Sequence, residues 1–152
     1  MTPSSINGSI VADKTAVVRR MLEAIATLPL GSQTEFLANP HDAAAGESYL
    51  RRGLEALLDL GRHLLAKGFG VAVTEYKEIA AGLRDRKVLT PDLASLLIEM
   101  AGYRNRLVHF YDEVTPLELY RILAERRHDL EKVLDALLAW ISSASRESHT
   151  ER

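Results

Sequence analysis

The sequence contains no cysteine among its 152 residues. Disulfide frameworks, thiolate metal sites and cysteine nucleophiles are therefore excluded. A chain of this length can bury one hydrophobic core without such cross-links. We expect a single domain over residues 1–152, with a core from about residue 10 to residue 142 and polar ends.

Long apolar runs are also missing. No stretch approaches the roughly eighteen consecutive apolar residues that a membrane-spanning helix needs. The segment from Met1 to Gly8 is polar and has neither the basic start nor the apolar stretch of a secretory signal. We therefore expect a cytoplasmic protein without a membrane partner.

The sequence also lacks an excess of positive charge. The 19 basic and 21 acidic residues give a formal net charge of -2, which disfavours a broad nucleic-acid footprint. Of the basic residues, 14 are Arg and 5 are Lys. Because Arg makes planar, bidentate contacts with phosphates, a local phosphate site is still compatible with this composition.

Hydrophobic periodicity predicts helices and no strand. Apolar residues recur at steps of three and four, as on the buried face of a helix. Thr90-Pro91 and the capping box Thr115 to Glu118 mark two helix starts. The expected segments are 11–28, 47–67, 74–86, a fourth from Thr90 and a last from 116 to 142, with an irregular stretch over 33–45. We predict an all-α fold: an antiparallel helical bundle of four main helices plus a short helix.

Several short patterns have ordinary structural interpretations. Gly68-Phe69-Gly70 follows a predicted helix and is typical of a helix stop rather than a dinucleotide site. The single Glu-x-x-His pair, Glu125 and His128, lacks the second pair that a di-iron bundle needs, and no metal site is predicted. Asp59 and His63, four residues apart, could form a ligand or catalytic pair or a hydrogen bond at the edge of the core.

The fourth predicted helix carries a charge inside its apolar stripe. On a helical wheel Arg104 and Tyr111 fall on the predicted buried face, and Asn105 and His109 share a neighbouring face. The apolar members of that face are Leu93, Leu96, Leu97, Met100, Leu107 and Val108. A guanidinium placed there needs a carboxylate, another subunit or a ligand phosphate. The spacing is equally consistent with a functional cleft and with an internal salt bridge to Asp59 or Glu55.

Residues 100–111 resemble the signature of the HEPN domain, in its HepT-like branch. The pattern of Arg, four residues, His, one residue and Tyr is met by Arg104, His109 and Tyr111, with Asn105 after the Arg. The resemblance extends to residues 54–63 and 114–120, and covers nearly the whole chain from about 10 to 142. One departure is Arg62, at a position where Asn is common in the family.

The resemblance implies a helical homodimer whose two Arg-His motifs face one cleft. It implies a metal-independent endoribonuclease without a cofactor, the toxin of a type VII-like toxin–antitoxin pair that acts on tRNA or mRNA. Its antitoxin partner would be a nucleotidyltransferase of the MNT type, which silences the toxin by AMPylation of Tyr111. Arg104, His109 and Asn105 would be catalytic, and Asp59, His63 and Arg106 are candidate supporting residues.

The residue types suit this chemistry. The reference pKa of His, about 6.5, allows proton transfer near neutral pH, and Arg104 would stabilise the charge that develops on a phosphate. Two other interpretations are a non-catalytic nucleotide- or substrate-binding subunit of a two-part nucleotidyltransferase and a plain dimerising adapter. The intact motif favours the ribonuclease and the non-catalytic binding subunit over the adapter, because an adapter needs no charge in an apolar stripe.

Overall fold

All the secondary-structure elements of the described chain are α-helices. The computed structural model describes residues 5–109 and 113–150. The helices are α1 (Gly8–Ala26), α2 (Gln33–Ala38), α3 (Pro40–Phe69), α4 (Tyr76–Asp85), α5 (Pro91–Val108) and α6 (Pro116–Thr150). The predicted all-α bundle of four main helices is confirmed, with α4 as the expected short helix and α2 as an additional one. None of the described helices is long and apolar enough to cross a membrane.

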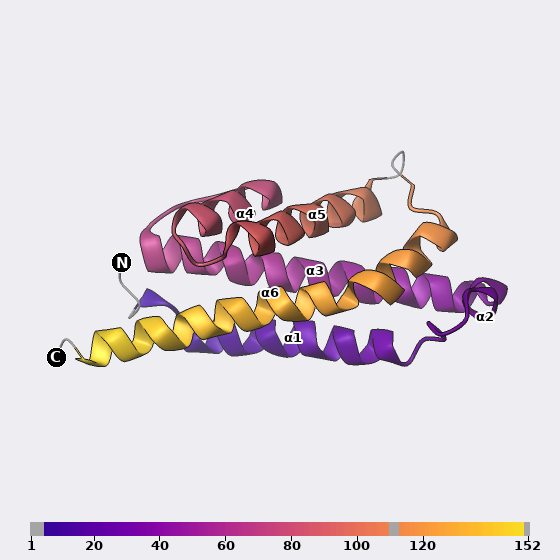
Figure 1. Cartoon of the computed structure of the whole chain (residues 1–152), viewed down its shortest axis with the longest axis horizontal. Helices are drawn as coiled ribbons and strands as arrows, with labels where there is room; N and C mark the ends of the chain where they lie inside the picture. Colours follow the sequence, from indigo (N-terminus) through magenta and orange to yellow (C-terminus); the bar gives the residue numbers. More distant parts are fainter. Residues whose placement is uncertain (1–4, 110–112, 151–152) are drawn as a thin grey trace.

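Helix α3 is the central element. It contacts each of the other five described helices, and Figure 1 shows α1 and α6 on one side of it and α4 and α5 on the other. Its predicted apolar residues are all at most 1% exposed, and they are Leu50, Leu54, Leu57, Leu58, Leu64 and Leu65. Burial on several sides at once makes α3 the scaffold on which the other helices are positioned.

The prediction of an irregular stretch over 33–45 is wrong. Helix α2 lies within it, and α3 begins at Pro40. The Ser32 hydroxyl accepts a hydrogen bond from the Glu35 N–H (3.2 Å), and the Asn39 side chain accepts one from the His41 N–H (3.0 Å). Asn at the N-cap followed by Pro at the first helical position is a helix-start signal that hydrophobic periodicity alone does not register.

The ends of the other helices follow local chemistry. Helix α3 stops at the predicted glycines, where Gly70 adopts a left-handed conformation with φ of 67°. Thr90 caps α5 as predicted, and the Thr115 hydroxyl accepts from the Glu118 N–H (3.2 Å). Helix α6 extends to Thr150, past the predicted end at 142, and Ala144 in this extension is 3% exposed.

The buried face of α5 differs from the prediction. Ala94 and Ala101 are buried together with Leu97 and Met100. Leu93, Leu96 and Leu107 are only half-buried, and Val108 is 37% exposed. The two small alanines therefore lie where the helix packs most closely, and the larger apolar side chains lie toward its margins.

Gly61 of α3 should not tolerate a side chain. A Cβ there would lie 2.9 Å from Cγ2 of Ile79, a stiff β-branched residue, and 3.1 Å from Cδ1 of Leu83. Overpacking of about 1–3 kcal/mol outweighs the helix-propensity gain of up to about 1 kcal/mol. We expect Gly61→Ala to lower the free energy of unfolding by about 1 kcal/mol, measured by urea denaturation.

Gly102→Ala is the matched control on α5, because a Cβ at this position would meet no neighbouring atom within 4 Å. Only the propensity gain applies there, so the free energy of unfolding should rise by about 0.5–1 kcal/mol. Equal effects of the two substitutions would contradict the close packing of α3 on α4.

Candidate functional site

The last turn of α5 and the residue after it carry the motif residues. Arg104 and Asn105 lie within α5, which ends at Val108. His109 follows as an exposed C-cap residue with extended backbone (φ -102°, ψ 122°). The prediction that His109 shares a helical face with Asn105 is therefore wrong, because the helix ends one residue before it. Tyr111, the predicted AMP acceptor, lies outside the described residues.

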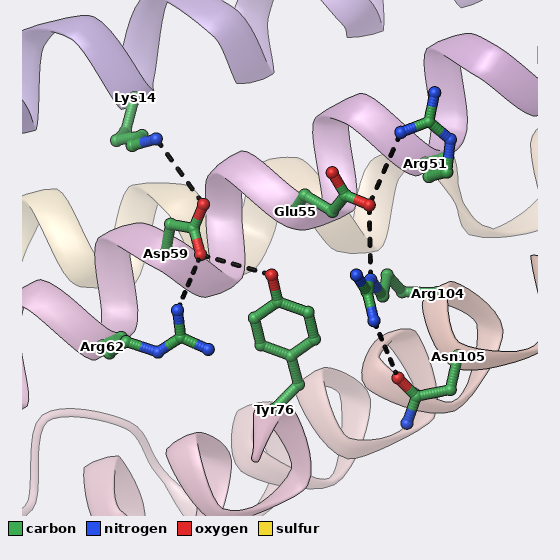
Figure 2. Close-up of polar contacts among 8 residues, drawn as sticks. All are labelled: Lys14, Arg51, Glu55, Asp59, Arg62, Tyr76, Arg104 and Asn105. Carbon is green, nitrogen blue, oxygen red and sulfur yellow. Dashed lines mark hydrogen bonds and ion pairs between the residues drawn. The ribbon is translucent and has the colours of Figure 1, made fainter. Parts of the chain in front are cut away.

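Arg104 is held on three sides. Its Nε donates to Glu55 Oε1 of α3 (3.3 Å), and its Nη1 donates to Asn105 Oδ1 (3.4 Å). The guanidinium carbon lies 4.6 Å from the centre of the Tyr76 ring. The side chain is 26% exposed. Figure 2 shows this arrangement, which confirms the internal salt bridge to Glu55 and not the alternative partner Asp59.

Asp59 lies at the centre of a second set of contacts, one turn further along α3. Its carboxylate contacts Lys14 Nζ of α1 (3.5 Å) and Arg62 Nη1 (3.3 Å), and accepts a hydrogen bond from the Tyr76 hydroxyl (3.4 Å). Burial, followed by the negative charge of Asp59, raises the pKa of Tyr76. Tyr76 thus remains a neutral donor that connects α4 to α3.

His63 pairs with the backbone of Asn7 rather than with Asp59. Its Nε2 accepts a hydrogen bond from the backbone N–H of Asn7 (3.0 Å), the residue that caps α1. Burial, with a further effect of Lys67, lowers the pKa of His63, which favours the neutral form that can accept this bond. Of the two interpretations of the Asp59–His63 spacing, the structure supports a histidine hydrogen-bonded at the edge of the core.

Arg62 and Arg104 line one hollow. Its volume is about 360 Å³, and its walls are Arg62, Thr74, Glu75, Tyr76, Lys77, Arg104 and Asn105. The sequence singles out Arg62 only as a departure from the family pattern and does not predict this position. Its spacing of three residues from Asp59 on one helix is the signal that could have predicted their ion pair.

His109 lines a different hollow. This one measures about 260 Å³ and is formed by Glu47, Arg106, Leu107, Val108, His109, Glu113 and Val114. Arg106 binds both carboxylate oxygens of Glu118, with 2.9 Å between Nη2 and Oε2, and this contact lowers the pKa of Glu118. The charge of Arg106 is thus largely balanced by Glu118, and Arg106 joins α5 to the start of α6.

In the part of the chain that the structure describes, the two motif side chains therefore line different hollows. Arg104 and Asn105 line the first hollow, whereas Arg106 and His109 line the second. Among the described residues, no group of three or more His, Asp or Glu side chains is arranged to hold a metal ion.

Several known proteins resemble this chain in sequence or in fold. A tRNA nuclease HepT from Aphanizomenon flos-aquae is 26% identical over 122 residues, which cover 80% of this chain and 82% of that protein. A solved structure of a tri-AMPylated HEPN toxin from Shewanella oneidensis in complex with an MNT antitoxin has the same fold. It is 22% identical, with 88% of this chain and 99% of the other covered and a TM-score of 0.79.

Another solved structure is that of YutE from Bacillus subtilis, a cytosolic protein of unknown function. It is 20% identical, with 92% of this chain and 94% of the other covered and a TM-score of 0.76. The family model described as ribonuclease HepT-like matches residues 18–137, most of the chain. The protein therefore belongs to the HepT-like ribonuclease family.

Proposed function

We propose that this protein is a HEPN toxin of a type VII-like toxin–antitoxin pair and a metal-independent endoribonuclease. One observation carries the proposal. The end of α5 combines a guanidinium that Glu55 and Asn105 already orient with an exposed imidazole five residues later. A fixed cation and an accessible proton carrier are the groups that RNA cleavage through the ribose 2′-hydroxyl needs.

Arg104 would stabilise charge on the scissile phosphate. Its Nε and Nη1 are engaged by Glu55 and Asn105, whereas no described residue takes a hydrogen bond from Nη2. A guanidinium fixed before substrate binds loses little orientational freedom in the transition state. Asn105 acts by positioning Arg104, and Asp59 supports the neighbouring Tyr76.

A second copy of the chain would complete the site. Because Arg104 and His109 line different hollows of one chain, we propose that a homodimer joins them across one cleft. The exposed Val108 and half-buried Leu107 beside His109 provide apolar surface for such pairing.

The reaction then divides between two histidines. The neutral His109 of one copy accepts the proton of the 2′-hydroxyl while that oxygen attacks phosphorus. The protonated His109 of the other copy donates a proton to the departing 5′ oxygen. The products are a 2′,3′-cyclic phosphate and a 5′-hydroxyl end, and both histidines return to their initial states after proton exchange with solvent.

The name of the Aphanizomenon relative makes tRNA the first substrate to test. The Shewanella complex supports the proposed partner, an MNT-type nucleotidyltransferase antitoxin, and AMPylation as its means of control. We propose Tyr111 as the acceptor. An AMP group two residues after His109 would add a bulky anion beside the cleft and repel RNA.

A non-catalytic nucleotide-binding subunit of a two-part nucleotidyltransferase is the second candidate. The separate positions of Arg104 and His109 within one chain favour it if no dimer forms, because a lone chain could then hold a phosphate without cleaving it.

His109→Ala should abolish RNA cleavage. We expect purified, unmodified protein to cleave tRNA in the presence of EDTA, and the variant to be slower by at least about 10³-fold, since general acid–base catalysis contributes about 10²–10⁴-fold per group. His128→Ala on α6, where the side chain is 68% exposed, is the control and should cleave normally. Equally inactive wild type and His109→Ala proteins would instead support the binding-subunit candidate.

Glu55→Gln should impair catalysis more than binding. Loss of the carboxylate charge loosens Arg104, and misplacement of a catalytic group by about 1 Å can cost 10²-fold in rate. We expect kcat to fall by about 10-fold to 10²-fold with KM changed less, in single-turnover and steady-state assays. Arg51→Gln removes the other cation on Glu55 (3.5 Å) and should leave kcat within a few-fold. Equal kcat losses in the two variants would contradict the positioning role.

AMPylation should map to Tyr111. After co-expression with an MNT-type nucleotidyltransferase antitoxin, intact-mass and peptide mass spectrometry should find one or more AMP units on the wild type and on Tyr103→Phe. Tyr111→Phe should gain none at that position and should cleave RNA despite the antitoxin. A Tyr111→Phe protein that is modified and silenced like the wild type would refute the assignment.

A further inference from the structure

The hollow between α3, α4 and α5 carries two cations, Arg62 and Lys77, that the proposed cleavage step does not use. Arg62, Lys77 and Arg104 line it, against one carboxylate, that of Glu75. The two carboxylates that anchor its arginines are each shared with a further cation. Glu55 contacts Arg51 as well as Arg104, and Asp59 contacts Lys14 as well as Arg62. Neither carboxylate therefore fully neutralises the arginine that it positions.

Tyr76 fixes the spacing of the two arginines. The guanidinium carbon of Arg62 lies 4.9 Å from the centre of the ring, and that of Arg104 lies 4.6 Å from it. Figure 2 shows the ring between the two side chains. Cation–π attraction and the hydroxyl bond to Asp59 hold this ring in place. The ring is thus engaged by guanidinium groups and is not available as a stacking platform for a base.

Both arginines retain donors for a ligand. Each guanidinium has five N–H donors. Arg62 uses one from Nη1 for Asp59 and one from Nη2 for the Thr74 carbonyl (3.1 Å), so each of these nitrogens keeps a second hydrogen. Among the described residues, none accepts a hydrogen bond from Nη2 of Arg104. Two anchored, partly exposed guanidinium groups in one hollow match the geometry and charge of a phosphate group.

We propose that this hollow binds a backbone phosphate of the RNA strand adjacent to the scissile one, with Arg62 as its principal contact. The proposal rests on the proposed function and extends it. Arg104 lies at the border between the two phosphates, and Arg62 lies across the Tyr76 ring from it. Arg62 is a binding residue, and its contribution comes through charge and hydrogen bonds to the strand rather than through proton transfer.

The salt dependence of RNA binding tests this directly. A fluorescein-labelled single-stranded RNA is titrated, by fluorescence anisotropy, with full-length protein that carries His109→Ala and therefore leaves the RNA intact. Each phosphate that the protein neutralises contributes about 0.7 to the slope of log Kd against log salt concentration. We expect Arg62→Gln to weaken binding several-fold at low salt and to reduce the slope by about 0.7 for each phosphate that is no longer neutralised.

Arg126→Gln is the matched control. Arg126 lies on α6, is 40% exposed against 38% for Arg62, and is likewise paired with carboxylates, those of Glu99 and Asp129. Its replacement should leave the slope unchanged. Lys77→Gln gives a second test if Arg62→Gln fails to fold, because Lys77 is an exposed member of the same hollow, and it should also reduce the slope.

Equal slopes for the His109→Ala protein and for its Arg62→Gln and Lys77→Gln derivatives would overturn the phosphate site. The result of the salt-dependence measurement can be distinguished from the result of the cleavage assay. A wild type that never cleaves RNA, combined with a reduced slope for Arg62→Gln, refutes the nuclease and retains the binding site. A wild type that cleaves, combined with unchanged slopes, retains the nuclease and refutes the binding site.

Discussion

The ion pair between Arg104 of α5 and Glu55 of α3 is the contact on which the site depends. Arg104 continues the stripe of α5 that buries Leu97 and Ala101 against the bundle, so its guanidinium needs a partner there. Glu55, on the central helix α3, supplies this partner, with 3.3 Å between Arg104 Nε and Glu55 Oε1. With side chains 26% and 27% exposed, such a pair contributes only about 0–1 kcal/mol to stability. Its main consequence is orientation, because it fixes where the guanidinium can meet a ligand.

This constraint also accounts for the separation of Arg104 from His109 within the described part of the chain. Glu55 draws Arg104 toward α3 and Tyr76, whereas the end of α5 at Val108 leaves His109 exposed beside Arg106 and Glu113. Arg106 is held by Glu118 and fixes the link to α6. The same helix terminus therefore sends its cation and its imidazole to different hollows. A second copy of the chain is the simplest way to join them.

Much of the helical fold was predictable from the local chemistry of the sequence. Leucine periodicity identified α3, glycines identified its end, and Thr90-Pro91 identified the start of α5. The Asn39-Pro40 helix-start signal is equally local. Hydrophobic periodicity does not detect it, because it lies before the leucine repeat. The orientation of α5 was not predictable, because a helical wheel ranks leucines above alanines, whereas close packing placed Ala94 and Ala101 inside. The choice of Glu55 over Asp59 as the partner of Arg104 depends on how α3 and α5 align, which single-helix spacing does not contain.

The most direct test of the shared cleft is the activity of a mixed dimer with one wild-type chain and one His109→Ala chain, purified through two different affinity tags. If both copies of His109 serve one cleft, this dimer should cleave RNA at a small fraction of the wild-type rate, well below half. A mixed dimer that retains half of the wild-type rate would show that each chain acts independently, and would contradict the shared cleft.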